Sequence, residues 1–377
     1  MKLEQRKWTE ESGWIISKSN RLKSKAQLVI VFGSTHILSD DVKFNEIKGF
    51  YPNANILSCS TAGEISDINV SDETIVCTAV EFEKTKLLST KLVINEFADS
   101  ISLGKKLVLD LPHENLRHVF ILSDGLNVNG SRLVKSINKY LPANVSVTGG
   151  LAGDGTAFQS SLVGLNEKPT SGIIAAIGFY GSALRIGYGS VGGWESVGPE
   201  RLITKSKANV LYELDNEPAI DIYKKYHGDQ ASELRISGYH FPLSIRTKKG
   251  KSLVRTIVSV DEDKNYITFA GDMPEGSYAR LLKADFDRLV DGAAVAAEDS
   301  FERINTDPDL AILISSVGRK QVLGDKINEE PGIVRNILGP KAVITGFYSY
   351  GEISPFVDSM NCEFHNQTMT ITTLAEV

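Results

Sequence analysis

Three glycine-rich turns that end in an acidic residue hold the side chains best suited to binding a ligand. Each turn follows a short apolar run, and the acids are Glu64, Asp154 and Glu352. Glycine lets the backbone approach a ligand closely, and α/β proteins usually bind ligands at turns that follow strands. A carboxylate at such a turn would take an ammonium or hydroxyl group. The same carboxylates could instead cap helices or hold the turns through backbone N–H groups.

The first turn also contains a candidate nucleophile. Cys59 is followed by Ser60 and Thr61, and a catalytic thiol needs a base that a third group orients. The sequence places no histidine nearby, so we interpret Cys59 as a small residue buried at a strand end. A hydrolase-type enzyme that uses Cys59 is therefore the least supported alternative.

Two histidines are candidates for ligating a haem iron, which needs a strong axial ligand beside an apolar slot. His240 has aromatic and apolar neighbours in the segment 239–243 and is the first choice as the metal ligand, with His36 second. The chain has no CxxCH motif, so a haem b would be bound without covalent attachment. A histidine among apolar residues can equally be a satisfied structural group.

Arg319 is a candidate for binding an anion, either a carboxylate or a haem propionate. A solvated loop is the alternative interpretation of this arginine. The glycines of 149–153 lack the GxGxxG spacing, and no GKS or GKT follows them, so a phosphate-binding loop is not indicated.

The three turns each end one copy of a repeated strand–helix–strand pattern. A continuous apolar run opens each copy, as a strand covered on both faces requires. Parallel strands joined through a helix are expected to have right-handed connections. The sequence therefore predicts an α/β fold of repeated βαβ-type units that form mixed sheets, with first strands at 28–33, 119–125 and 310–315 and second strands at 54–58, 144–148 and 341–345.

Two further segments interrupt or join these copies. Residues 238–282 have the alternating pattern and charged turns of a β-rich insertion. Residues 286–304 contain four alanines and predict a closely packed helix. The glycine-rich segment 187–198 leaves room for two halves of the molecule to hinge.

The bulk composition excludes several classes of function. A chain of 377 residues predicts two domains. Its formal net charge of −6 does not favour nucleic acid, which requires a concentrated basic face. No apolar run is long enough to span a membrane, the N-terminus lacks a signal-peptide core, and three scattered cysteines suit a reducing compartment. These features predict a cytoplasmic protein without a membrane partner.

Several motifs, in order along the chain, resemble those of the FIST N and FIST C regions, which form a sensory module in signal transduction. The resemblance implies an N-terminal lead segment at 1–27, a FIST N-like domain at 28–205 and a FIST C-like domain at 206–377 that contains the β-rich insertion. The segments that carry the resemblance are 59–65, 149–155, 209–215, 316–319, 346–353 and 365–368.

The resemblance implies ligand sensing, and one branch of the family is similar to haem-binding nitric-oxide sensors. Our leading hypothesis is therefore a haem-dependent nitric-oxide or gas sensor. It would regulate a partner histidine kinase or cyclic-dinucleotide enzyme in trans, because the chain carries neither segment itself. The alternative is a haem-free sensor of a small metabolite resembling an amino acid, and a homodimer is left open. The expected ligand-binding residues are Cys59, Ser60, Thr61, Glu64, Asp154, Arg319, Tyr350 and Glu352.

Overall fold

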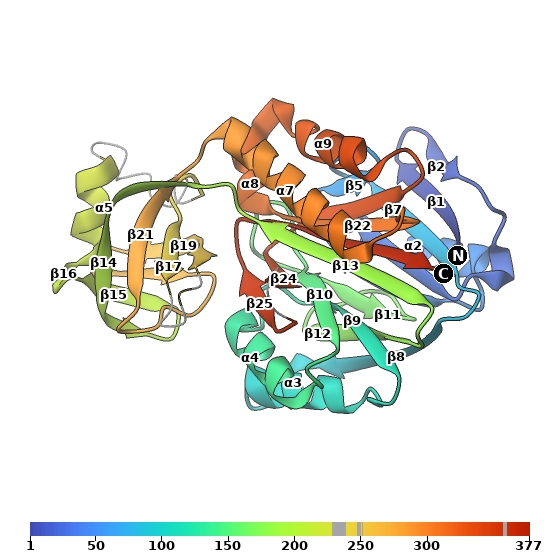
Figure 1. Cartoon of the computed structure of the whole chain (residues 1–377), viewed down its shortest axis with the longest axis horizontal. Helices are drawn as coiled ribbons and strands as arrows, with labels where there is room; N and C mark the ends of the chain where they lie inside the picture. The colour runs from blue at the N-terminus through green and yellow to red at the C-terminus, as the bar shows by residue number, and fades with distance from the viewer. Residues whose placement is uncertain (228–238, 247–249, 251, 357–359) are drawn as a thin grey trace.

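The computed structural model describes residues 1–227, 239–246, 250, 252–356 and 360–377. Figure 1 shows a large body and a smaller β-rich unit connected by two strands, β14 (Glu195–Lys207) and β21 (Tyr278–Lys283). We call residues 195–283 the β-domain and the remainder the three-sheet body. Within the described residues, no helix is long and apolar enough to cross a membrane.

Three similar units build the three-sheet body, and each has two parallel strands, a crossover helix and a third strand antiparallel to the first. This arrangement confirms the α/β fold with repeated βαβ units. The first unit contains β3 (Leu28–Gly33), α2 (Asp41–Phe50), β4 (Asn55–Ser60) and β7 (Ile75–Glu81). The second contains β9 (Leu116–Ser123), α4 (Gly130–Tyr140), β10 (Ser146–Leu151) and β12 (Ile173–Tyr180). The third contains β22 (Leu310–Ser316), α8 (Val317–Leu323), α9 (Glu329–Leu338), β23 (Val343–Ser349) and β26 (Met369–Glu376).

Each unit also contributes the strand after its second strand to the sheet of another unit. From the first unit, β5 (Glu64–Ser66) pairs with β23 of the third. From the second unit, β11 (Val163–Leu165) pairs with β4 of the first. From the third unit, β24 (Gly351–Pro355) pairs with β10 of the second. The hairpin partners β6 (Asn69–Ser71) and β25 (Cys362–His365) extend two of these sheets. The exchange is cyclic, and it explains why the repeated turns, which precede the exchanged strands, lie close together.

Antiparallel strands complete the other side of each sheet. In the first sheet, β1 (Lys2–Thr9) pairs with β7, and β2 (Gly13–Lys18) pairs with the other edge of β1. In the other two sheets, β8 (Lys86–Val93) pairs with β12 and β13 (Leu184–Val191) pairs with β26. Every residue of β3 and β22 is buried, because both faces of these strands are covered, as their continuous apolar runs predict. Phe32 and Phe347 stack with ring centroids 4.6 Å apart, joining the first and third units in the core.

Helix α7 (Phe286–Ile304) packs directly on β13 (Figure 1). A Cβ added at Gly187 would clash with the carbonyl oxygen of Ser300, and one at Gly189 with that of Ala296. Both glycines are therefore required for the helix and the strand to approach closely. The helix predicted at 286–304 is confirmed, and three of its four alanines noted above, Ala293, Ala296 and Ala297, are fully buried.

The β-domain has its own apolar core and an antiparallel sheet. The β-rich segment predicted at 238–282 supplies β17 (Leu243–Arg246), β18 (Ser252–Arg255), β19 (Ile257–Asp261), β20 (Tyr266–Phe269) and most of β21. Earlier residues complete it with β14, β15 (Val210–Leu214), β16 (Glu217–Pro218) and α5 (Ala219–His227). The core side chains include Ile203, Leu211, Tyr223, Ile267 and Phe269.

The predicted domain boundary between residues 205 and 206 rests on the order of the motifs along the sequence. The three-sheet body contains residues from both sides of that division, because β5 pairs with β23, β10 with β24 and β13 with β26. Strand exchange thus joins the two motif regions into one body, from which the β-domain projects.

Candidate functional site

The strand exchange creates a cleft of about 340 Å³ at the carboxyl ends of β3 and β4, which we call the turn cleft. Parallel strands that end at the same edge of a sheet commonly place ligand-binding residues there. Short helix α1 (Thr35–Leu38) follows β3 at this edge. The lining residues are Ser34, Thr35, His36, Thr61, Gly63, Glu64, Asp72, Glu73, Asp154, Gly155, Ala157, Gln159 and Ser160.

Glu64 lies at the base of the turn cleft and is 1% exposed. Its carboxylate accepts hydrogen bonds from the hydroxyl groups of Thr61 and Thr74, the latter at 2.7 Å, and from the backbone N–H of Thr74 at 3.2 Å. Burial raises the pKa of Glu64 to about 7, although these hydrogen bonds oppose the shift. The carboxylate therefore ties the turn to the start of β7.

Glu352 has the same environment in the third unit. It accepts hydrogen bonds from the Ser349 hydroxyl at 2.7 Å, the Thr368 hydroxyl at 2.8 Å and the Thr368 backbone N–H at 3.1 Å. Burial raises its pKa to about 8. Because Ser349 and Thr368 correspond to Thr61 and Thr74, the repeated glutamates share a role in holding the turns.

Asp154 departs from this pattern. Its carboxylate accepts hydrogen bonds from the backbone N–H groups of residues 158–160 and from the Tyr350 hydroxyl. Asp124 instead holds the start of β12, accepting from the Gly172 backbone N–H at 2.6 Å and the Ser161 hydroxyl at 2.8 Å. Asp124 was not predicted as a site residue, although an acid followed by glycine directly after an apolar run was a usable signal. Asp154 therefore organises a loop in the cleft wall.

Two contacts lie near the outer part of the turn cleft. His36 Nδ1 lies 2.8 Å from Glu73 Oε2, and both side chains are about two-thirds exposed. Lys320 pairs with Asp72 and donates to the Ala62 carbonyl at 2.9 Å. The roles of Asp72 and Glu73 could not be predicted from the sequence, because only the fold brings their loop to this position.

Thr35 adds a polar group whose hydrogen-bonding capacity is not used by the protein. Its hydroxyl oxygen is buried in the cleft wall and has no hydrogen-bond partner among the described residues. Buried hydroxyl groups normally have a partner. The Thr35 hydroxyl is therefore a buried polar group without a partner at the wall of the cleft.

The remaining residues predicted around the first turn lie inside the protein. Cys59 is fully buried in β4, and burial raises its thiol pKa well above the usual value. Ser60 donates to the Gly153 carbonyl at 2.7 Å and accepts from the Leu162 backbone N–H at 2.8 Å. These positions suit internal packing and turn stabilisation rather than contact with a ligand.

Tyr350 lies beside the cleft wall rather than lining it. Its hydroxyl group contacts Asp154, and its ring stacks on Phe158 with centroids 4.2 Å apart. Phe158 also stacks on Tyr239, with centroids 6.3 Å apart. This row of rings connects the Asp154 loop with the segment that enters β17.

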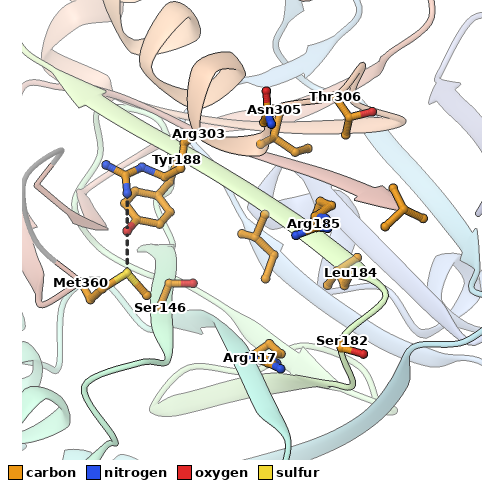
Figure 2. Close-up of a pocket in the computed structure, with 13 residues that line it drawn as sticks. Arg117, Ser146, Ser182, Leu184, Arg185, Tyr188, Arg303, Asn305, Thr306 and Met360 are labelled. Atoms are coloured by element: carbon orange, nitrogen blue, oxygen red, sulfur yellow. Dashed lines mark hydrogen bonds between the residues drawn. The ribbon is translucent and has the colours of Figure 1, made fainter.

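A larger cavity, which we call the arginine pocket, has a volume of about 960 Å³ (Figure 2). It lies where β9 begins, alongside β13 and the end of α7. The lining residues are Arg117, Ser146, Ser182, Leu184, Arg185, Ile186, Tyr188, Arg303, Ile304, Asn305, Thr306, Met360 and Val377. The pocket could not be predicted from the sequence, because its residues belong to elements far apart in the chain.

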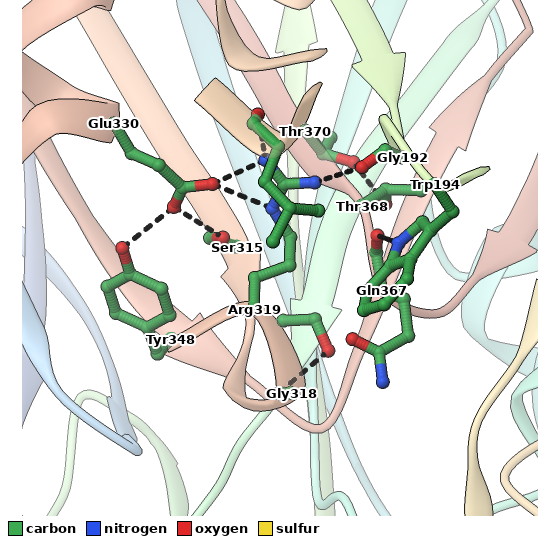
Figure 3. Close-up of polar contacts among 12 residues, drawn as sticks. Gly192, Trp194, Ser315, Gly318, Arg319, Glu330, Tyr348, Gln367, Thr368 and Thr370 are labelled. Carbon is green, nitrogen blue, oxygen red and sulfur yellow. Dashed lines mark hydrogen bonds and ion pairs between the residues drawn. The ribbon is translucent and has the colours of Figure 1, made fainter. Parts of the chain in front are cut away.

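Arg319 lies in a buried polar network rather than in either cavity (Figure 3). Its guanidinium group pairs with Glu330 and donates to the backbone carbonyls of Gly192 and Leu289. Glu330 also accepts from the Tyr348 hydroxyl at 2.9 Å. Since these groups of the chain itself engage Arg319, it links helices α7, α8 and α9 rather than presenting a free anion site.

The two candidate haem ligands have different surroundings. His36 contacts Glu73 at a small cleft that is rich in carboxylates, whereas haem requires an apolar slot and carries negatively charged propionates. His240 is half-buried, and burial lowers its pKa. Within the described residues, it lines neither the turn cleft nor the arginine pocket. The described residues also contain no cluster of three or more side chains suited to a metal ion.

Comparisons with known proteins find matches over most of the chain. Residues 27–217 match the FIST N domain, and residues 219–355 match the FIST C domain. An uncharacterised protein of Methanocaldococcus jannaschii is 25% identical over 291 residues, which cover 70% of this chain and 55% of that protein. The chain thus spans about half the length of this curated relative. A crystal structure of cyanuric acid hydrolase from A. caulinodans aligns with 78% of this chain and 99% of its own, at 9% identity and a TM-score of 0.19.

Proposed function

The chain belongs to the FIST family, and on that premise we propose that it senses a small, positively charged metabolite in the turn cleft. FIST domains indicate a sensory, ligand-binding role in signal transduction. The observation that carries the proposal is the set of four carboxylates in the cleft wall, which favours a ligand with an ammonium group. A volume of about 340 Å³ suits a ligand of amino-acid size. The carboxylates are those of Glu64, Asp72, Glu73 and Asp154.

The exposed and the buried carboxylates have separate roles in this proposal. The ligand's ammonium group replaces the His36 contact at Glu73 and competes with Lys320 for Asp72. Glu64 remains engaged with Thr61 and Thr74 and, because burial raises its pKa to about 7, carries only part of a negative charge at neutral pH.

The loop held by Asp154 connects the ligand site with the rest of the molecule. Ligand contact with Gln159 or Ser160 changes the loop that Asp154 holds. The rings of Phe158 and Tyr239 then carry that change toward the β-domain. Such signalling requires two states of the loop with different ligand affinity. For the receiving partner, the family resemblance favours a histidine kinase or a cyclic-dinucleotide enzyme acting in trans.

Thermal denaturation with matched ligand pairs tests the proposal. Free amino acids and small amines should raise the melting temperature, because they bind the folded state selectively. Their N-acetylated counterparts, which lack the ammonium charge, should leave it unchanged. Equal shifts within each pair, or flat curves across the panel, would contradict a site selective for cations.

The haem hypothesis has its own spectroscopic test. We expect no Soret band from bound haem after reconstitution, because His36 contacts Glu73 in a carboxylate-rich cleft and His240 lines neither the turn cleft nor the arginine pocket in the described part of the chain. A stable Soret band that His240→Ala weakens would reverse this conclusion and return the function to haem-dependent gas sensing.

A further inference from the structure

We propose that the arginine pocket is a second ligand site, which binds a phosphorylated metabolite of up to nucleotide size. Three guanidinium groups line it, from Arg117 on β9, Arg185 on β13 and Arg303 on α7 (Figure 2). No Asp or Glu side chain is among its described lining residues. In a chain with net charge −6, this local excess of positive charge distinguishes the pocket from the acidic turn cleft.

Two of these arginines are available to a ligand. Arg117 and Arg185 are exposed, and neither forms an ion pair with a carboxylate in the part of the chain that the structure describes. An arginine presents a planar fork of N–H donors that matches phosphate oxygens in pairs. Each of these two exposed guanidinium groups, which come from different strands, can therefore engage a phosphate group.

The third guanidinium group is held in position by an aromatic residue. Arg303 donates to the Tyr188 hydroxyl at 3.2 Å and lies over the Tyr188 ring, 4.3 Å from its centroid. The Tyr188 hydroxyl contacts Met360 Sδ at 3.1 Å, as Figure 2 shows. Arg303 therefore supplies a fixed positive charge beside an aromatic surface.

The rest of the wall suits a molecule that has both a charged and an uncharged part. Leu184, Ile186 and the Tyr188 ring offer apolar surface, whereas Ser146, Ser182 and Thr306 offer hydroxyl groups. Ligand pockets typically combine an apolar lining with a few polar groups, and a volume of about 960 Å³ falls at the upper end of their usual range. This combination favours an organic phosphate over a bare inorganic anion.

Calorimetric titration of the full chain tests this proposal, with pyrophosphate and adenosine diphosphate as phosphate probes and citrate as a carboxylate probe. Adenosine diphosphate should bind, and Arg117→Gln or Arg185→Gln should weaken it about tenfold or more, because each removes a charge-assisted hydrogen bond. Both arginines are exposed, so the variants should keep the wild-type melting temperature. Arg288→Gln, at an exposed arginine of α7 outside the pocket, is the matched control and should bind like the wild type.

Three outcomes would overturn the proposal: no binding of either phosphate probe, binding of citrate alone, or equal weakening by Arg288→Gln. Binding of pyrophosphate but not the nucleotide would also reject the assignment to an organic phosphate. The inference is independent of the turn cleft, so Asp72→Asn should leave phosphate binding unchanged. A failure of cation binding and a failure of phosphate binding can thus be told apart.

Discussion

At the residue scale, repetition separates architectural carboxylates from those available to a ligand. Glu64 and Glu352 accept equivalent hydrogen bonds in the first and third units. Asp154 departs from that pattern and holds a loop of the turn cleft. The sequence identified all three acids and their shared turns. It could not identify Asp72 as a neighbour of the cleft, because the position of Asp72 depends on β5 and β6 pairing away from their own unit.

Titration of the buried glutamates should make the protein less stable as pH rises. An unfolded glutamate titrates near pH 4.3, whereas burial raises the pKa of Glu64 to about 7 and that of Glu352 to about 8. The folded state therefore binds more protons between these values, and the stabilisation present at low pH is lost as pH rises through the folded pKa. Each carboxyl group lowers the free energy of unfolding by up to about 1.4 kcal/mol for each unit of pH increase in this range.

Glu352→Gln isolates one of these titrations. The free energy of unfolding of the variant should be about 1–3 kcal/mol lower than that of the wild type, because its amide cannot accept all the hydrogen bonds of the carboxylate. It should also show a shallower fall of stability with pH. Urea unfolding of both proteins from about pH 5 to 9 measures the two slopes. Parallel curves would show that Glu352 does not titrate in this window.

At the element scale, continuous apolar runs predicted the central strands and the repeated units, because those strands are covered on both faces. Strand exchange could not be predicted, since β5, β11 and β24 are short and do not encode their partner sheet. The glycines of 187–198 leave room for a hinge. Two of them, Gly187 and Gly189 in β13, allow α7 to contact the strand closely.

Gly187→Ala should therefore destabilise the protein by about 3 kcal/mol, because the new methyl group clashes with the Ser300 carbonyl. Gly332→Ala in α9 is the matched control, since a Cβ there meets no atom within 4 Å. The control should be neutral or stabilising by up to about 1 kcal/mol. Chemical denaturation compares the variants, and equal stabilities would refute close packing as the reason for Gly187.

At the scale of the whole molecule, a buried arginine joins the β-domain to the three-sheet body. Arg255 is 3% exposed and donates to the Phe364 carbonyl at 3.0 Å. Burial lowers its pKa to about 10, so it stays charged at neutral pH. The sequence predicted a β-rich insertion, but the contact with Phe364 was not predictable from residues 109 positions apart.

Arg255→Ala should let the β-domain unfold separately from the body. Removing the guanidinium group leaves the Phe364 carbonyl without this partner and weakens the junction. Scanning calorimetry should show one transition for the wild type and two for the variant. Arg246→Ala, which breaks an exposed pair with Glu200 inside the β-domain, should retain a single transition. A single transition for Arg255→Ala as well would contradict its role at the junction.

The central claim is that carboxylates of the turn cleft bind a cationic metabolite. Calorimetric titration of the most effective amine from the thermal panel, into the wild type and the double variant Asp72→Asn/Glu73→Gln, tests it most directly. The double variant should bind at least about tenfold more weakly, because two charged partners of the ammonium group are lost. Glu329→Gln, at an exposed glutamate of α9 outside the cleft, should bind like the wild type. Unchanged affinity in the double variant would contradict the proposed site.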